Sequence, residues 1–301
     1  RWAGYRLRAL DATTICEPGA DRATWRLQVG YDLASGQVDH VELTDGSGAE
    51  SLRRLPHRPG DIVLADRGYA KPRDLRPVIE HGAHFVVRTG WNALRLVHPD
   101  GAAFDLFAAL AAQTAQEGEV EVGVVEDKKV AEPLILRLLI RRKSPKEAKA
   151  ERKRLLKEAK KRGKKPDPRT LEAANYILLL SSLPGAAFST ADVLALYRFR
   201  WQLELAFKRM KSLAHLDELA AKKPELAQAW IYARLIAFLI AEQCAGQVPE
   251  SSPSGSIKTS RKPVALAPRK DRSRHRPRRH SRTIALAPRL QRFHAHSPSS
   301  L

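Results

Sequence analysis

The sequence predicts a mixed α/β fold, in which helices cover the faces of one sheet. Three observations favour this class. Strand-like alternation opens the chain, an unbroken apolar run typical of a buried strand follows, and helical patterns separate the later strands. With 301 residues and 43% hydrophobic content, the chain is long enough to bury one large core or two small ones.

Three strands are predicted first. The first alternates so that Leu7, Ala9, Asp11 and Thr13 share one face. The second and third are separated by Ala34-Ser35-Gly36, which is typical of an antiparallel hairpin. The predicted strands are 5–15, 24–33 and 37–45.

A buried strand between two helices follows. Residues 61–66, DIVLAD, form an apolar run that ends in a carboxylate, which is typical of a strand buried on both faces. A short helix is predicted within 48–60, and a second over 71–82, where an internal proline could kink it. Residues 83–90 predict another short strand.

The pattern changes after residue 90. Short strand patterns and then a basic helical run, 141–165, predict an insertion that is mostly β. The strand patterns lie at 94–98, 119–125 and 133–140. The predicted organisation is a first part of the core at 1–90, the insertion at 91–174, a second part of the core at 175–246 and a disordered basic tail at 247–301.

The second part of the core begins with a predicted strand at 175–184. Ser189 and Asp192 then make a capping box for a helix that carries the segment YRFRWQLELAFKRMKS, residues 197–212. A last helix is predicted over 223–246.

The net charge of +20 is concentrated in two segments. Residues 141–165 hold 14 Lys/Arg and 3 Glu, a net +11, and residues 247–301 hold 13 Lys/Arg and 2 acidic residues, again +11. Such segments can neutralise phosphates and release counterions, so nucleic acid is the predicted partner. The alternatives are a solvated helix stabilised by Glu/Lys pairs for the first segment and plain disorder for the second.

Composition also excludes several classes. The most apolar run, 231–241, is much shorter than the about 20 residues of a membrane span and contains Arg234. Cys16 and Cys244 alone cannot make a disulfide framework or a Cys-rich zinc site. Nothing resembles a signal peptide, so a cytoplasmic location is expected. Because the chain opens on Arg1 instead of Met, it is expected to be truncated at its N-terminus.

Four polar residues of the segment 197–212 share one face of its predicted helix. At about 100° per residue, they fall within an arc of roughly 60°. These residues are Tyr197, Arg200, Glu204 and Lys211. The apolar stripe expected to pack on the sheet consists of Leu196, Phe199, Leu203, Phe207 and Met210.

Carboxylates lie where predicted strands end. Asp11 is at or near the end of the first strand, and Asp66 ends the apolar one, directly before Gly68. If these strands are neighbours, the two aspartates converge at one sheet edge, and the helix with Glu204 can add a third carboxylate. Three oxygen donors suit Mg²⁺ or Mn²⁺ better than zinc. Two such ions about 4 Å apart would polarise a phosphodiester and activate water or a 3′-hydroxyl.

Three blocks of the sequence resemble the catalytic blocks of bacterial insertion-sequence DDE transposases of the IS-four family. The resemblance covers about residues 1–245. The blocks are LDATTICEPG, VLADRGYA and the spacing Tyr197-x2-Arg200-x3-Glu204-x6-Lys211.

The resemblance implies a ribonuclease H-like catalytic core that a mostly β insertion interrupts. It also implies that Asp11, Asp66 and Glu204 are the catalytic triad and bind two Mg²⁺ or Mn²⁺ ions. The residues implied to contact DNA phosphates near the cleavage point are Tyr197, Arg200 and Lys211. Family members that form a DNA hairpin hold a flipped base with a tryptophan of the insertion. Here no tryptophan lies between Trp91 and Trp201, and only Tyr176 is in that region.

The implied function is hydrolysis of a phosphodiester at a transposon end, followed by transfer of the 3′-hydroxyl into target DNA. The implied partners are double-stranded DNA and a second subunit in a synaptic complex, in the bacterial cytoplasm at the nucleoid and without a membrane. Two alternatives stay open. One is a catalytically inactive DNA-binding remnant or inhibitor, and the other is a metal-dependent nuclease that cuts without joining.

Other readings of the same residues also stay open. Arg200, Glu204 and Lys208 have the i, i+4, i+8 spacing of a surface ion-pair ladder. Asp11 and Asp66 could each only cap a turn. The rival carboxylates in or beside the first strands are Asp21, Asp32, Asp39 and Asp45, of which Asp45 precedes a glycine as in a turn.

Overall fold

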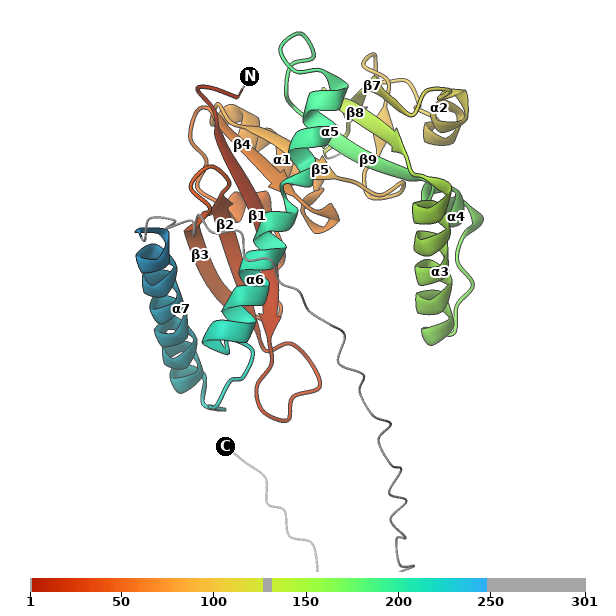
Figure 1. Ribbon diagram of the computed structural model, residues 1–301. Helices are drawn as coiled ribbons and strands as arrows, with labels where there is room; N and C mark the ends of the chain where they lie inside the picture. Colours follow the sequence, from red (N-terminus) through yellow and green to blue (C-terminus); the bar gives the residue numbers. More distant parts are fainter. Residues whose placement is uncertain (1, 127–131, 248–301) are drawn as a thin grey trace, which may run out of the picture. The chain divides into compact units, whose positions relative to one another are not determined.

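The structure is a computed structural model that describes residues 2–126 and 132–247 (Figure 1). The predicted basic tail, 247–301, lies outside the described residues except for Gln247, the last residue of the final helix. The described residues belong to one compact unit.

Nine strands form one mixed sheet in the order β3-β2-β1-β4-β5-β9-β8-β7-β6. β1 pairs antiparallel with β2 and parallel with β4, which in turn is parallel to β5. From β5 to β6 every pairing is antiparallel. The strands are β1 (Arg6–Ile15), β2 (Trp25–Asp32), β3 (Gln37–Asp45), β4 (Asp61–Ala65), β5 (His84–Arg88), β6 (Leu96–Val97), β7 (Glu117–Val124), β8 (Leu134–Arg142) and β9 (Tyr176–Ser181). The predicted mixed α/β class is confirmed.

Seven α-helices accompany the sheet in the described ranges. They are α1 (Pro72–Glu80), α2 (Leu106–Ala112), α3 (Pro145–Lys161), α4 (Pro168–Ala173), α5 (Thr190–Arg198), α6 (Trp201–Ala214) and α7 (Pro224–Gln247). The helix predicted within 48–60 is only one 3₁₀ turn, η1 (Leu52–Arg54), and a second 3₁₀ turn, η2 (Arg67–Tyr69), follows β4. Pro77 lies inside α1, which continues through it as one helix.

The helices lie on both faces of the sheet, and the side-chain parity of the strands decides which face each residue meets. On one face, Ala9 of β1 packs with α6 and α7, and Leu64 of β4 packs with α5 (Figure 1). On the other face, Leu10 and Val63 pack with α1 and η1. All five residues of β4 are buried, as its apolar run predicted.

The helix predicted through the segment 197–212 is broken. Residues Phe199 and Arg200 form a turn between α5 and α6, with short i→i+3 bonds from Phe199 N to Leu196 O and from Arg200 N to Tyr197 O (3.0 and 3.2 Å). The arc calculated for one continuous helix therefore does not apply across this turn, although Phe199 and Arg200 keep right-handed helical dihedrals. Phe199, predicted to be in the buried stripe, is 50% exposed, whereas Leu203 is buried.

The strands predicted for residues 91–174 are present as β6, β7 and β8, and α3 occupies most of the predicted basic run. Helices α2 and α4 were not predicted. Because β8 pairs with β9, the sheet continues without interruption from the predicted insertion into the predicted second part of the core. The division at residues 90 and 174 stays a prediction. Among the residues that the structure describes, no helix is both long enough and apolar enough to span a membrane.

Candidate active site

The parallel pairing of β1 with β4 brings two aspartates to one edge of the sheet. The last paired residues are Leu10 and Ala65, so Asp11 and Asp66 occupy the next step of the register. Asp11 has the parity of Ala9 and Asp66 that of Leu64, which places both on the sheet face that α5 and α6 cover. The predicted convergence of these two residues is confirmed.

The turn after β4 holds Asp66 in place. The backbone carbonyl of Asp66 accepts a hydrogen bond from Tyr69 N (3.0 Å), and the buried Tyr69 hydroxyl donates to Gln28 Oε1 (2.8 Å). A Cβ atom on Gly68 would lie 1.7 Å from Glu50 Oε2, so a larger residue there would require the Glu50 carboxylate to shift. Glu50 is thus a further acidic group beside the site, and nothing in the sequence pattern pointed to it.

One arginine links the carboxylates of the sheet and the helix. Arg200 Nη1 donates to Asp11 Oδ2 (3.1 Å) and Arg200 Nη2 to Glu204 Oε1 (2.5 Å). Because both oxygens bind one planar guanidinium, they are at most about 8 Å apart. The Arg200 side chain is 13% exposed and Glu204 is 51% exposed. The Arg200 guanidinium is therefore largely shielded from solvent, whereas Glu204 is accessible to it.

Asp66 completes the group. Its charge acts on Asp11, Arg200 and Tyr197, and its side chain makes no hydrogen bond or ion pair with any residue that the structure describes. Asp11 and Asp66 are thus neighbours, and Glu204 is joined to Asp11 through Arg200. As placed, no three acidic, His or Cys side chains in the described ranges form a metal site, since Arg200 lies between two members of the triad.

The donor types nevertheless fit a divalent ion. Asp11 and Asp66 are half-buried carboxylates beside each other, an arrangement that is costly without a compensating cation. Burial, followed by the nearby charges of Asp66 and Glu50, raises the pKa of Asp11 to about 6, although its own backbone hydrogen bond and Arg200 oppose the rise. A cation that takes over from Arg200 would find three oxygen donors of the kind that Mg²⁺ and Mn²⁺ prefer.

The raised pKa predicts that replacing Asp11 stabilises the metal-free protein. Since the pKa is raised from 3.8 to about 6, folding favours the protonated acid, and ionised Asp11 destabilises the fold as the pH rises through this window. In EDTA at pH 7.5, Asp11→Asn should raise the free energy of unfolding by about 2 kcal/mol. The gain should vanish near pH 4.

Denaturant titrations between pH 4 and 8 measure this difference. Asp21→Asn, at an exposed aspartate in the loop after β1, is the matched control and should follow the wild type at every pH. A variant at Asp11 that is no more stable than the wild type at pH 7.5 would contradict the assigned burial cost.

The other predicted DNA-contacting residues lie on both sides of the helix break. The Tyr197 hydroxyl, on α5, donates to Ala65 O (3.1 Å), and burial together with Asp66 raises its pKa. Lys211 lies on α6, seven residues after Glu204 and therefore about 10 Å further along the helix. Tyr197 and Arg200 thus contact the site directly, and Lys211 lies at a distance from it.

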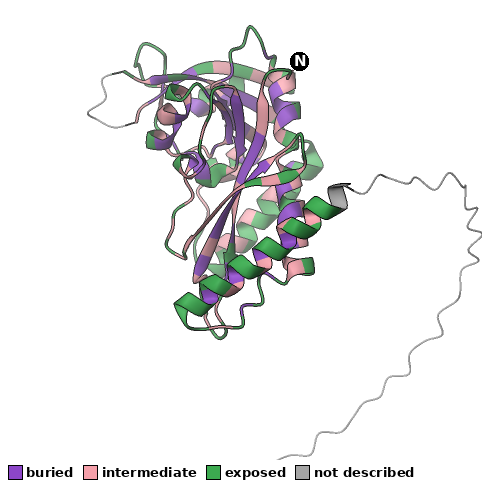
Figure 2. Ribbon diagram, turned by 90° about the vertical axis from the view of Figure 1, so that its left-hand side faces the viewer, coloured by how far each residue is buried: buried purple, intermediate pink, exposed green. Residues whose placement is uncertain are grey.

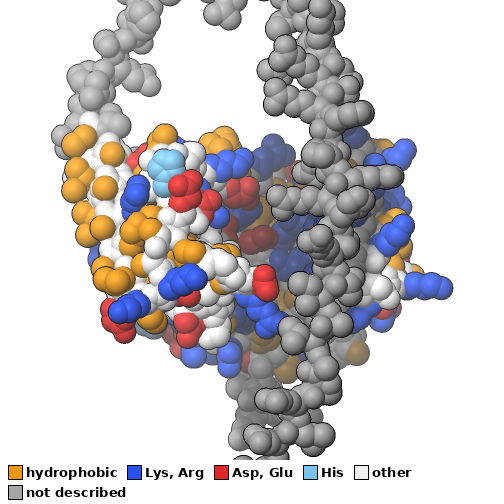
Figure 3. Space-filling view, turned by 90° about the horizontal axis from the view of Figure 1, so that it is seen from below, with side chains coloured by type: hydrophobic (Ala, Val, Ile, Leu, Met, Phe, Trp, Pro, Cys, Tyr) orange, Lys and Arg blue, Asp and Glu red, His pale blue; other side chains and the backbone are white. Residues whose placement is uncertain are grey.

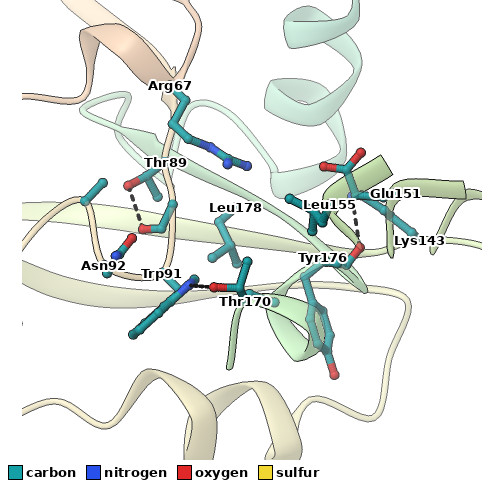
Figure 4. Close-up of a pocket in the computed structure, with 14 residues that line it drawn as sticks. Arg67, Thr89, Trp91, Asn92, Lys143, Glu151, Leu155, Thr170, Tyr176 and Leu178 are labelled. Carbon is teal, nitrogen blue, oxygen red and sulfur yellow. Dashed lines mark hydrogen bonds between the residues drawn. The ribbon is translucent and has the colours of Figure 1, made fainter. Parts of the chain in front are cut away.

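A cavity of about 160 Å³ lies beside the site, between β5, β9, α3 and α4 (Figure 4). Trp91 forms one wall, where its Nε1 donates to Thr170 Oγ1 (3.1 Å) and the Arg169 guanidinium stacks on its ring at 4.5 Å. Arg67, the residue after Asp66, lines the cavity together with Lys143.

Two cations, Arg67 and Lys143, line this cavity, and the charge of Arg88 acts on both. Burial, followed by the charge of Arg88, lowers the pKa of Arg67, and burial and the same two arginines lower the pKa of Lys143 although Glu151 opposes this. Lys143 Nζ donates to Ala174 O (3.0 Å). Arg67 and Arg88 form no ion pair in the described part of the chain. The sequence analysis counted Lys143 in the basic run 141–165 but did not find the cluster, because its members come from η2, β5 and the residue after β8.

The four rival aspartates lie in turns, in an ion pair or in an exposed loop. Asp32 and Asp45 accept backbone hydrogen bonds within their turns, as predicted for Asp45. Asp39 binds the buried Arg8 (2.8 Å) at the other end of β1, and Asp21 is exposed in a loop.

The ion-pair ladder is present only in part. Arg200 pairs with Glu204, whereas Glu204 has no ion pair with Lys208 in the described residues. In α3 of the basic run, Arg154 pairs with Glu151 and Glu158 on the same helix. The charged face of α3 is thus partly neutralised by internal pairs, and most of its lysines remain exposed.

Comparisons with known proteins agree with the resemblance. The transposase of insertion sequence element IS421 from Escherichia coli is 43% identical over 243 residues, which cover 79% of this chain and 66% of that protein. The transposase of IS231F from Bacillus thuringiensis subsp. israelensis is 24% identical over 269 residues, covering 78% of this chain and 55% of that protein. The chain therefore spans roughly half to two-thirds of the length of these relatives.

Among solved structures, one chain of a cryo-EM piggyBac transposase synaptic complex with hairpin DNA aligns with 80% of this chain and 48% of its own. Its TM-score is 0.41 at 9% identity, too low to bear on fold or function. The family model described as "Transposase DDE domain" matches residues 2–240, which is most of the chain. The resemblance carried by the three sequence blocks is thus confirmed, and the chain belongs to the transposase DDE domain family.

Proposed function

We propose that this chain is the catalytic region of a DNA transposase that cleaves a phosphodiester at the end of an insertion sequence and joins the freed 3′-hydroxyl to target DNA. The observation that carries the proposal is the convergence of Asp11 and Asp66 at one edge of the sheet, with Glu204 of α6 joined to Asp11 through Arg200. Cations border this acidic group, as expected for a site that handles a phosphate backbone.

The strand order supports a ribonuclease H-like core within the sheet. Three antiparallel strands, β3, β2 and β1, are followed by the parallel β4 and β5. Helices α5 and α6 cover the face to which the first two acidic residues belong. The antiparallel strands β8, β7 and β6 would then be the insertion between Asp66 and Glu204.

Asp11, Asp66 and Glu204 would hold two Mg²⁺ or Mn²⁺ ions. When bound, such ions polarise the phosphodiester and make water or a 3′-hydroxyl a better nucleophile. Arg200 would leave one of its two carboxylates and bind a phosphate oxygen of the cleaved strand instead, since its guanidinium already lies between Asp11 and Glu204. Tyr197 would position the end of β4 through its bond to Ala65 O and contact the backbone beside it.

Further basic residues would hold the flanking DNA. Lys211 would bind a phosphate farther along α6, while Arg67, Arg88 and Lys143 offer cationic charge on the side toward α3. The exposed lysines of α3 would add attraction that is independent of sequence and sensitive to salt. The partners would be double-stranded DNA and a second subunit in a synaptic complex, in the cytoplasm at the nucleoid.

A cleavage and joining assay tests the proposal. The complete protein, supplied with Mg²⁺ and DNA that carries the ends of its own insertion sequence, should produce nicked ends and products joined to a target plasmid. Cutting without any joining would favour a metal-dependent nuclease. Tight, salt-sensitive DNA binding with no cleavage in Mg²⁺ or Mn²⁺ would favour an inactive remnant or inhibitor. Both results would overturn the proposed reaction.

A further inference from the structure

The outward face of α7 is apolar along most of its length. The side chains of Leu226, Tyr232, Ile236 and Ile240 are 58%, 44%, 56% and 57% exposed. Between Glu225 and Glu242 the only charged residue is Arg234, which is half-buried. Figure 2 shows exposed residues along this helix, and Figure 3 shows hydrophobic side chains gathered where it lies, on the left. A surface helix normally presents charged residues to water.

The patch continues onto the neighbouring helix. Leu213, near the end of α6, is 70% exposed and borders a hollow of about 360 Å³ that Ala237 and Phe238 also line. Exposed alanines of α7 lie between and beside these large side chains. An exposed apolar patch that extends over two helices is typical of an interaction site.

The shape of this patch is complementary to the same patch on a second copy. Two neighbouring rows of residues run along α7 at i, i+4 spacing, one large and one small. The large row is Tyr232, Ile236 and Ile240, and the small row is Ala229, Ala233, Ala237 and Ala241, all exposed. When the ridge of one helix lies in the groove of an identical helix, the second ridge meets the first groove at the same time. A two-fold interface requires this reciprocity.

We propose that this face binds a second copy of the same chain, with the α7 helices packed against each other about a two-fold axis. The tail that follows α7 is a poorer occupant on composition. Residues 248–301 contain seven prolines and a net charge of +11, and no apolar stretch comparable to the face. The patch has almost no negative charge that would attract these basic residues. The inference deepens the subunit pairing proposed above by assigning its surface, and it needs neither DNA nor metal.

Sedimentation and light scattering of the protein without DNA test the assignment. Between about 1 and 100 μM the mass should change from one chain to two. Ile236→Glu combined with Ile240→Glu should raise the dimer dissociation constant at least about 100-fold, because two buried apolar anchors become charges. Leu156→Glu, at a side chain of α3 that is 49% exposed, is the matched control and should leave the constant unchanged.

Cysteine cross-linking gives a second readout. In a protein whose Cys16 and Cys244 are replaced by serine, Ala233→Cys or Ile236→Cys should form disulfide-linked dimers under mild oxidation, and Leu156→Cys should not. A monomer at every concentration would overturn the inference, as would a dimer that the glutamates at 236 and 240 do not weaken. If removal of residues 248–301 were needed before a dimer formed, the tail would be the occupant instead. DNA cleavage by a monomer would refute this surface while leaving the proposed function intact.

Discussion

Glu204→Gln is expected to lower Mg²⁺-dependent DNA cleavage by at least about 10³-fold, because it removes the charge of the only triad member that comes from a helix. The fold should not change. Glu204 is 51% exposed, and its one ion pair within the described residues is with Arg200, which keeps Asp11 as a partner. The initial cleavage rate of the complete protein at saturating Mg²⁺, on DNA with the ends of its insertion sequence, is the quantity to compare.

Two controls separate catalysis from binding and folding. Glu218→Gln changes a carboxylate that is 72% exposed just after α6 and should cleave at the wild-type rate. The Glu204 variant should also bind the DNA at least as tightly as the wild type, because it carries one negative charge fewer at the phosphate path. Full cleavage by Glu204→Gln would remove Glu204 from the catalytic triad.

The sequence could place the two aspartates because their positions follow from local patterns. The alternation in β1 and the apolar run of β4 set both strands and the faces of their residues. Once the strands are parallel neighbours, Asp11 and Asp66 must meet at the same edge. The third carboxylate depended on a helix that crosses this edge, and there the three sequence blocks carried information that periodicity alone does not.

The helix break shows where periodic patterns stop being informative. Residues 190–214 contain no proline or glycine, so nothing local marks an end at Arg198. The turn at Phe199 and Arg200 lets α5 follow β8 and β9 while α6 packs on β1, a requirement of the tertiary structure. The break places Arg200 at the start of α6, where its guanidinium reaches both carboxylates.

Glu50 and the cluster of Arg67, Arg88 and Lys143 were missed for a similar reason. Each residue looks ordinary within its own segment, and its importance comes from neighbours that the fold supplies from distant strands and turns. Charge counting found the basic run 141–165, which includes Lys143, but could not find the isolated Arg67 and Arg88 that act on it. Only a run of like charges changes the composition of a segment enough to be detected from the sequence.

At the opposite end of β1 from Asp11, the buried Asp61 forms ion pairs that stabilise the fold. Asp61 is 1% exposed and binds Arg6 through two hydrogen bonds of 2.7 and 2.8 Å. It also accepts Arg58 N (3.1 Å) and faces the buried Arg8 at 3.4 Å. Arg8 in turn binds Asp39 and Pro56 O (both 2.8 Å). The pairing thus ties the starts of β1 and β4 to the segment before β4.

Asp61→Asn is therefore expected to lower the free energy of unfolding by about 3 kcal/mol at pH 7, because it removes a charge whose buried partner remains. Burial alone would raise the pKa of Asp61, but Arg6 and the Arg58 amide outweigh it and lower the pKa below 3.8. The stabilisation is therefore present above the unfolded pKa and is lost as the pH falls through the folded one.

This pH dependence is opposite in sign to that of Asp11 on the same strand pair. Denaturant titrations from pH 2.5 to 7 should show the free energy of unfolding of Asp61→Asn approaching that of the wild type only at the acid end. The free energy of unfolding of Asp11→Asn should exceed that of the wild type only toward neutral pH. Asp217→Asn, at an exposed aspartate after α6, should follow the wild type throughout. A loss below about 1 kcal/mol at pH 7 would mean that Arg6 and Arg8 find other partners, and that this end of the sheet does not depend on the ion pairs.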